Sequence, residues 1–496
     1  MPEPWAAFRE ADAGSAKPNG RLDCMPSSRL NCVQVMNSRL SNRAFVFTVV
    51  AWLALWVAVL PAGRAGATLS DAVRVSTLPN GLRVLVLENH KAPVAAFVVF
   101  YKVGSRNEQF GKTGISHLVE HLMFRGTKTV GPEEFSRIIQ ENGGMDNAFT
   151  TEDYTAYFEV INKDHFDVPI RLEADRMANF APQGFDSEKA VVIEERRLRT
   201  EDNPQDALFE IAQAQAFVEH PYHWPVIGWM NDLKGLTLDD ALRYHQVYYS
   251  PQNAIIVAVG DFNAAEVERK ISESFATIKN GPKAPPVTQV EPPQKGERQV
   301  ELRRPAELPA VAVGFHTPNY RNTDSFALEV AAEILSDGKS SRLYKKLVVD
   351  RRMVVSVDAD YDRLSFDPNL LWITAQLRPQ VKVQDALGEI NGEIAALRAS
   401  PPDPQELQKA KNLVQASFVY GQDSIFREAM LLGQYEMLGD YRMVDQYLPG
   451  IDSVTSADVS RVAAEYMSQP QRTLAILIPT GMLPHPAAGG GGAIVR

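Results

Sequence analysis

Cysteine is almost absent from this chain of 496 residues. Only two cysteines occur, Cys24 and Cys32, and both lie near the N-terminus. A chain that begins at about Thr68 would contain none, so it could form no disulfide and would offer no thiolate to a metal. Any metal site in that part of the chain must therefore use His, Asp or Glu.

Positive charge is also in deficit. The chain has 51 Lys and Arg against 61 Asp and Glu, a formal net charge of -10. Because phosphate binding needs a basic surface, this balance argues against a nucleic-acid partner. It fits a protein that meets neutral or basic partners.

One long apolar run occurs near the N-terminus, at residues 44–60. Arg39 and Arg43 precede it, and the small residues 65–67 follow it, which is the layout of a secretory signal peptide. Met36 begins a better basic region than the residues before it, so we expect translation to start there. We predict export to the periplasm; if the run is not cleaved, it would anchor the chain in the inner membrane.

The order of predicted strands and helices occurs twice along the chain. The length favours more than one domain, and a segment rich in Pro and charge at 281–299 predicts a linker. Strand, helix and strand patterns at 310–320, 325–338 and 472–480 repeat those at 94–105, 114–127 and 253–262. The predicted parts are a leader over 1–67, domains over 68–280 and 300–480, and a flexible tail over 481–496.

The segment GISHLVEHLMFRGT (114–127) holds two histidines four positions apart, His117 and His121. On a helix both imidazoles lie on one face and can bind one zinc ion. Glu120 lies close enough to act as general base on a zinc-bound water, and H-x-x-E-H is a protease motif. The alternative is a buried helix with incidental histidines, but burying these groups without a ligand would be costly.

A third ligand is expected on the acidic segment DSEKAVVIEERRLRTEDNP. Glu188 and Glu195 are seven residues apart and share a helix face, whereas Glu194 points about 100° away. One of them as ligand, with a second carboxylate that orients the site, is a common arrangement. A charged surface helix explains the same pattern, and the residues alone leave the choice open.

Five motifs in order resemble the M16 zinc peptidases, which include the mitochondrial processing peptidase β-subunit and insulin-degrading enzyme. The resemblance covers residues 75–480. It implies an α+β fold of two homologous α/β domains, each a mainly antiparallel sheet packed with helices, and two such pairs that close around a chamber. The motifs are GISHLVEHLMFRGT, NGGMDNAFTTEDYTAYFEV, SEKAVVIEERRLR, HPYHWPVIG and YSPQNAIIVAVGDF.

The resemblance also implies roles for single residues. Glu195 matches the third zinc ligand and Glu188 the acid behind the site, with one zinc per chain. The segment around Asn147, Ala148 and Phe149 matches an edge strand to which a peptide substrate adds. The alternative for this strand is ordinary packing of its aromatic side chains.

The loop HPYHWPVIG offers a second pair of histidines, His220 and His223. Pro221 and Pro225 make this loop rigid and leave it without a helix face. We therefore expect these histidines to pack or form hydrogen bonds rather than bind a metal.

The chain departs from the family in its second half. Active members place an Arg and a Tyr, seven residues apart, near the substrate carbonyl, a charge stabilisation that such sites need. Here Val348 and Val355 occupy those positions. Other basic or aromatic residues nearby are at different places or spacings: Arg342, Tyr344, Arg351 and Tyr361.

The missing pair predicts a division of labour between two subunits. This chain would be the zinc-bearing peptidase subunit and would act on peptides or unfolded segments with an Arg/Tyr-bearing homologue, or alternatively as a homodimer. A non-catalytic scaffold or assembly subunit is the rival function. That function predicts an eroded site, whereas His117, Glu120, His121 and Glu195 are all present.

Overall fold

The computed structural model describes residues 68–481. The expected signal peptide or anchor, the start at Met36 and all but the first residue of the expected tail lie outside the described residues. The fold below belongs to the compact unit that begins at Ala72. None of the helices described between residues 68 and 481 is both long and apolar enough to cross a membrane.

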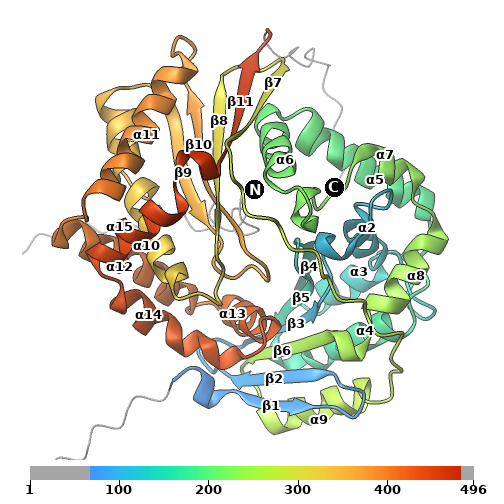
Figure 1. Cartoon of the computed structure of the whole chain (residues 1–496). Coiled ribbons are helices and arrows are strands. Elements are labelled where there is room, and N and C mark those ends of the chain that lie inside the picture. Colours follow the sequence, from blue (N-terminus) through green and yellow to red (C-terminus); the bar gives the residue numbers. More distant parts are fainter. Residues whose placement is uncertain (1–67, 482–496) are drawn as a thin grey trace, which may run out of the picture. The chain divides into compact units, whose positions relative to one another are not determined.

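A six-stranded sheet forms the first half of this unit, in the order β1-β2-β6-β3-β5-β4 (Figure 1). Only β2 and β6 pair in parallel, and the other neighbours are antiparallel. β4 ends the sheet and leaves one free edge. The strands are β1 (Arg74–Thr77), β2 (Arg83–Glu88), β3 (Val94–Tyr101), β4 (Met145–Thr150), β5 (Thr155–Asn162) and β6 (Ala254–Gly260).

Helices cover one face of this sheet and build the first core. Phe97 and Val99 of β3 point into this core with Leu118 and Leu122 of α2, and all four are fully buried. The helices of this half are α2 (Ile115–Leu122), α3 (Glu134–Glu141), α4 (Asp167–Ala178), α5 (Phe185–Arg196), α7 (Met230–Gly235), α8 (Leu238–Tyr248) and α9 (Ala264–Phe275).

The second half repeats this sheet with five strands, in the order β7-β11-β8-β10-β9. Again only one pair, β7 with β11, is parallel. The prediction of two homologous halves with mainly antiparallel sheets is confirmed. The strands are β7 (Arg298–Arg304), β8 (Ala310–Thr317), β9 (Val354–Tyr361), β10 (Asn369–Leu377) and β11 (Arg472–Pro479), and the helices are α10 (Asp324–Ser336), α11 (Val383–Ala399), α12 (Pro404–Gly421), α14 (Tyr447–Ser453) and α15 (Ser456–Tyr466).

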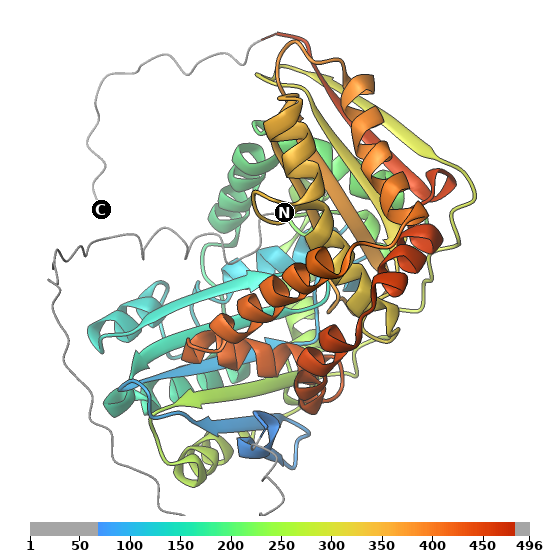
Figure 2. The same cartoon turned by 90° about the vertical axis from the view of Figure 1, so that its left-hand side faces the viewer.

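Two helices are exchanged between the halves. α6 (Pro204–Ala216) lies between the first-half helices α5 and α7 in sequence but packs on β7, β8 and β11, while α13 (Ile425–Met437) packs on β3 and β6 (Figures 1 and 2). The rings of Phe426 in α13 and Phe158 in β5 lie 4.3 Å apart. Because both faces of β3 are covered, its sequence is a continuous apolar run rather than an alternating one.

The connection between the halves differs from the expected linker at both ends. It runs from the end of α9 at Phe275 to the start of β7 at Arg298, and residues 276–297 contain neither helix nor strand. Glu291 fixes this connection, because its carboxylate accepts hydrogen bonds from the backbone N–H groups of three residues: Val218, Glu219 and His220.

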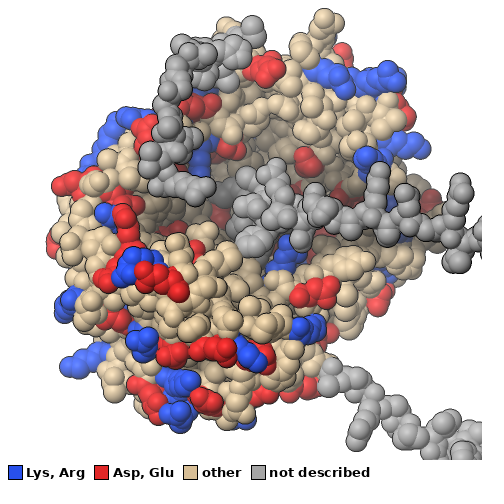
Figure 3. All heavy atoms as spheres, turned by 180° about the vertical axis from the view of Figure 1, so that it is seen from behind, with Lys and Arg blue, Asp and Glu red and all other residues tan. Residues whose placement is uncertain are grey.

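Surface charge is mixed on the face of the molecule in Figure 3. Lys and Arg side chains lie among Asp and Glu side chains there rather than in one continuous basic stripe. Among the described residues, exposed charges are also paired along helices, such as Arg269 with Glu273 at 2.6 Å and Arg137 with Glu141 at 2.7 Å. Such exposed pairs contribute little to stability.

Candidate metal centre

α2 begins at a glycine whose backbone has the left-handed conformation that glycine adopts most easily. Gly114 caps the helix with φ +84°, and Gly228 of the loop 220–228, at φ +81°, lies directly against it. Glu108 accepts hydrogen bonds from the N–H groups of Gly114 (2.7 Å) and Ser116 (2.8 Å), which anchors the helix N-terminus. These contacts fix the direction in which α2 presents its side chains.

Two histidines of α2 and one glutamate of α5 converge. The ring centroids of His117 and His121 are 4.7 Å apart. Their Nε2 atoms lie 3.9 Å and 3.3 Å from Glu195 Oε2. One donor atom of each residue lies within 4.8 Å of the other two, a convergence that the described residues show nowhere else. Two imidazoles and a carboxylate with a fourth position open are the ligand set of a catalytic zinc site.

The ligands are held from behind by charged partners. His121 Nδ1–H donates to Glu188 Oε1 at 2.9 Å, and Arg125 Nε lies 3.4 Å from the other oxygen of Glu188. Arg199 pairs with Glu195 Oε1 at 3.0 Å, which leaves Oε2 facing the histidines. Such partners set the tautomer and the orientation of metal ligands.

The side chains of this cluster have strongly shifted pKa values. Burial lowers the pKa of His117 to about 3, so its imidazole is neutral. Burial also opposes the charge on His121, but the hydrogen bonds with Glu188 and Glu195 outweigh it and raise the pKa of His121 to about 9. Burial opposes ionisation of Glu195, yet the hydrogen bond from His121 and the charges nearby lower its pKa to about 2.

Glu120 lies on the same helix, next to His121. Only 8% of its surface is exposed. Burial raises the pKa of Glu120 to about 7, although the hydrogen bond from Thr150 opposes this shift. A carboxylate with a pKa near neutrality suits proton transfer at neutral pH.

The free edge strand lies beside this cluster, because α2 packs against β4. Asn147 is exposed on β4 and Ala148 is partly buried. The ring of Phe149 packs against those of Tyr154 (5.9 Å) and Phe158 (6.5 Å). The strand therefore combines a free hydrogen-bonding edge with aromatic packing.

The second pair of histidines forms hydrogen bonds and lies outside the cluster. His220 Nε2 is 3.1 Å from Asp367 Oδ2. His223 Nδ1–H donates to the carbonyl of Phe217 at 2.7 Å. The loop 220–228 thus serves to pack the two halves and to seat α2.

The residues around the expected Arg/Tyr positions are engaged elsewhere. Val348 packs at the second core, while Val355 is exposed on β9. The nearby basic and aromatic residues have other partners. Arg342 forms an ion pair with Glu406 and Arg351 with Glu389, and the Tyr361 hydroxyl donates to the carbonyl of Pro318.

Three residues of the site were missed in the sequence. Arg199 is four residues after Glu195, a spacing that could have predicted its ion pair. Arg125 and Thr150 come from other segments of the chain, and only the fold brings them to Glu188 and Glu120.

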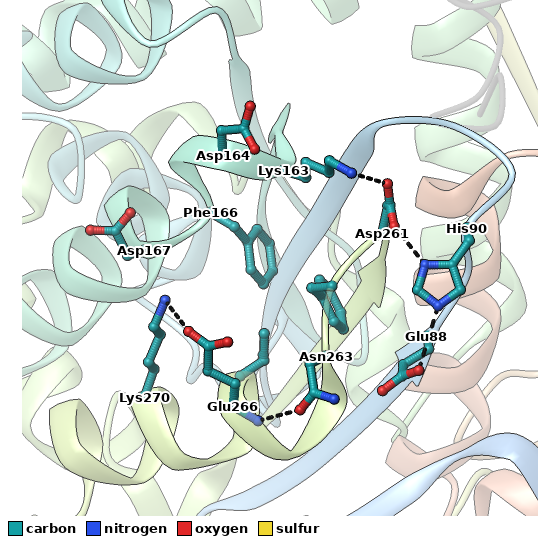
Figure 4. Close-up of a pocket in the computed structure, with 12 residues that line it drawn as sticks. Glu88, His90, Lys163, Asp164, Phe166, Asp167, Asp261, Asn263, Glu266 and Lys270 are labelled. Carbon is teal, nitrogen blue, oxygen red and sulfur yellow. Dashed lines mark hydrogen bonds and ion pairs between the residues drawn. The ribbon is translucent and has the colours of Figure 1, made fainter.

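A separate polar cavity of about 540 Å³ lies where β2 and β6 end, beside α9, and the stacked rings of Phe166 and Phe262 are part of its lining (Figure 4). Its basic side chains are all paired. His90 and Lys163 both contact Asp261, and the remaining lysine of the lining pairs with Glu266. None of the predicted site residues lines this cavity.

Comparisons with known proteins identify both halves of the chain. Residues 83–228 match the family model described as Insulinase (Peptidase family M16), and residues 235–414 match the model described as Peptidase M16 inactive domain.

Curated relatives and solved structures agree with these models. A zinc protease PqqE of Helicobacter pylori is 35% identical over 410 residues, which cover 81% of this chain and 92% of the relative. An uncharacterized zinc protease of Mycobacterium leprae is 28% identical and covers 81% of this chain and 90% of its own length. The crystal structure of a protease from Helicobacter pylori matches with a TM-score of 0.80 and 33% identity, over 82% of this chain and 99% of that one.

Proposed function

Because the chain belongs to peptidase family M16, we propose that it is a zinc-dependent endopeptidase that hydrolyses peptides or unfolded segments of polypeptide. The observation that carries the proposal is the convergence of His117, His121 and Glu195 beside the buried carboxylate of Glu120. Its relatives named zinc proteases share this ancestry.

The residues present suit the chemistry of peptide hydrolysis. One zinc per chain, held by His117, His121 and Glu195, would supply Lewis acidity and lower the pKa of a bound water. Glu120 would accept the proton of the attacking water and pass it to the amine that leaves. Glu188 would keep His121 in the tautomer that presents Nε2 to the ion.

The proposed substrate is an extended segment that adds to the free edge of β4. Main-chain hydrogen bonds along a strand edge give affinity with little side-chain selectivity. Asn147, Ala148 and Phe149 would contact the added strand. The main-chain groups of a folded segment are already hydrogen-bonded and cannot pair with the edge of β4. We therefore expect unfolded chains to be cleaved and folded proteins to be spared.

We further propose a partner subunit of the same fold. Val348 and Val355 offer no charge or hydroxyl to the developing oxyanion, so a homologue that carries the Arg/Tyr pair would complete the site. Turnover should rise when such a homologue is co-expressed. No gain over this chain alone would favour a self-sufficient monomer or homodimer.

We propose export to the periplasm on the basis of the leader sequence. Fractionation without detergent should release the protein with periplasmic contents. Recovery only in the inner-membrane fraction would indicate an uncleaved anchor.

Metal dependence tests the proposed activity. Chelation should abolish cleavage of an internally quenched peptide, and turnover should return linearly until one zinc per chain is bound. Glu195→Gln should lose both zinc and turnover, whereas Glu194→Gln, an exposed neighbour paired with Arg197, should retain both. Unchanged turnover after complete metal removal would exclude the proposal, and absence of zinc binding would favour a scaffold role.

A further inference from the structure

We propose that Thr150 is a positioning residue that holds Glu120 for catalysis and links its orientation to the strand that receives the substrate. This inference rests on the proposed function, because it assigns a role within the same site. It concerns orientation: which way the Glu120 carboxylate points, and what fixes it there.

A single hydrogen bond orients the buried carboxylate. Thr150 Oγ1 donates to Glu120 Oε2 at 2.5 Å. Among the residues from 68 to 481, Glu120 has no other side-chain or backbone donor within hydrogen-bond distance. With Oε2 held, Oε1 is free to accept the proton of a water.

Thr150 is itself held by the sheet. It is the last residue of β4 and lies opposite Thr155 of β5. The two hydroxyl oxygens are 3.4 Å apart, and the fully buried Thr155 donates to the carbonyl of Val103 at 2.9 Å. The branched side chain of threonine also restricts its χ1 rotation. The donor to Glu120 therefore has a position set by β4 and β5 rather than by α2.

The same strand carries the edge at which we place the substrate. On its other side β4 has no neighbour in the sheet, so it is fixed on one side only until a peptide adds to it. Strand addition would restrain β4 on both sides and with it the Thr150 hydroxyl. Since misplacing a catalytic group by about 1 Å can cost about a hundredfold in rate, this restraint would act on kcat.

Removing the hydroxyl while keeping the shape tests the role. Thr150→Val should lower kcat about tenfold to a hundredfold, with KM within about twofold and zinc content unchanged. Thr150→Ser should restore most of kcat, because the serine hydroxyl can make the same bond. Thr151→Val is the matched control. Within residues 68–481 the Thr151 hydroxyl bonds only in its own turn: it donates to the carbonyl of Tyr154 and accepts from the N–H groups of Asp153 and Tyr154. This variant should lose thermal stability and keep kcat.

Crystal structures of the zinc-loaded wild type and both Thr150 variants give a readout that needs no turnover. Glu120 should have one conformation in the wild type and the serine variant, and should rotate or become multiple in the valine variant. An unmoved Glu120 in Thr150→Val, or a serine variant as impaired as the valine variant, would overturn the proposal. A wild type that binds zinc but cleaves no peptide, either alone or with an Arg/Tyr-bearing homologue, would refute the proposed function instead, and the structures would still decide the role of Thr150.

Discussion

His121 has a carboxylate at each ring nitrogen, Glu188 at Nδ1 and Glu195 at Nε2. In the metal-free protein this arrangement keeps a proton on His121, since its pKa is raised to about 9. The Nε2 atom can bind zinc only after that proton leaves. Protons and zinc therefore compete for the same nitrogen of His121.

Zinc affinity should therefore depend on pH through His121. Above the pKa of Glu120, about 7, and below about 9, zinc binding should release one proton. The dissociation constant should rise about tenfold for each unit of pH lowered from 8.5 to 7.5. Calorimetry in buffers of different ionisation enthalpy measures the released proton. An affinity that is independent of pH in this window would contradict the assignment.

Without zinc, the stability of the fold should change with pH in the opposite direction to the zinc affinity: it should fall as the pH rises. Because the pKa of His121 is raised above its ordinary value of 6.5, its ion pairs contribute fully below that pH. Their contribution is lost as the pH rises through about 9.

Glu188 should contribute to zinc affinity without binding the ion. Glu188→Gln weakens the acceptor at His121 Nδ1, so we expect the dissociation constant for zinc to rise about tenfold to a hundredfold. Glu133→Gln is the matched control, because Glu133 pairs with the same Arg125 at 3.0 Å but is exposed. Competition with a chromogenic chelator measures both. Equal affinities in the two variants would rule out the role of Glu188.

Some residues of the site could be predicted from the sequence and others could not. His117, Glu120 and His121 lie within one turn of one helix, so helix geometry alone places them together. Glu195 needed the family resemblance, since spacing could not distinguish a ligand from a surface charge. Thr150 could not be predicted, because its contact with Glu120 depends on how β4 packs against α2.

At the scale of elements, the start of α2 depends on contact between two glycine backbones. A Cβ on Gly228 would overlap Gly114 Cα and the carbonyl carbon of Thr113. Neither backbone can move away without turning α2 and its histidines. The loop 220–228 thus matters to the metal site although its own histidines do not bind there.

Gly228→Ala should therefore destabilise the protein and weaken zinc binding. We expect a loss of about 3 kcal/mol, from backbone overlap added to the strain of a positive φ. Gly111→Ala is the matched control, with φ +83° and nothing within 4 Å of the added Cβ, and should cost about 1 kcal/mol. Urea denaturation measures both. Equal losses would show that the glycine contact is unimportant.

Element boundaries show where the sequence was insufficient. The acidic segment that carries Glu188 and Glu195 is not one uniform helix: α5 ends at Arg196 and a π-helical turn follows at Arg197–Glu201. Arg196 is buried there and bonds to Glu210 and to the carbonyl of Gly228. That long-range contact, which no periodicity encodes, accompanies the change in helix type.

At the scale of the whole molecule, the exchange of α6 and α13 joins the two cores. α13 lies so close to the first sheet that a Cβ on Gly433 would overlap the ring of Phe100. The two halves should therefore unfold together rather than one after the other.

Gly433→Ala tests this exchange. Overpacking against Phe100 should cost about 1–3 kcal/mol. Gly392→Ala, in the interior of α11 with nothing within 4 Å of the added Cβ, should instead stabilise by up to about 1 kcal/mol. Denaturant titrations followed by tryptophan fluorescence and by circular dichroism measure both. A stable Gly433→Ala variant, or separate transitions in the wild type, would contradict the joined core.

The two homologous halves were predictable from the sequence, but the exchange was not. Repeated strand and helix patterns show that two similar units exist, and the apolar residues of α6 and α13 show that each has a buried face. A buried face does not specify which sheet covers it. Leu208 of α6 packs near Trp372 of the second sheet, a contact between residues far apart in the sequence.

Turnover of an internally quenched peptide by zinc-loaded wild type and Glu120→Gln, compared at equal zinc content, tests the central claim most directly. The amide cannot accept the proton of water, so the account predicts a loss of about a thousandfold or more with zinc still bound at one per chain. Equal turnover by the two proteins would contradict the assignment of Glu120 as the general base and with it the proposed mechanism.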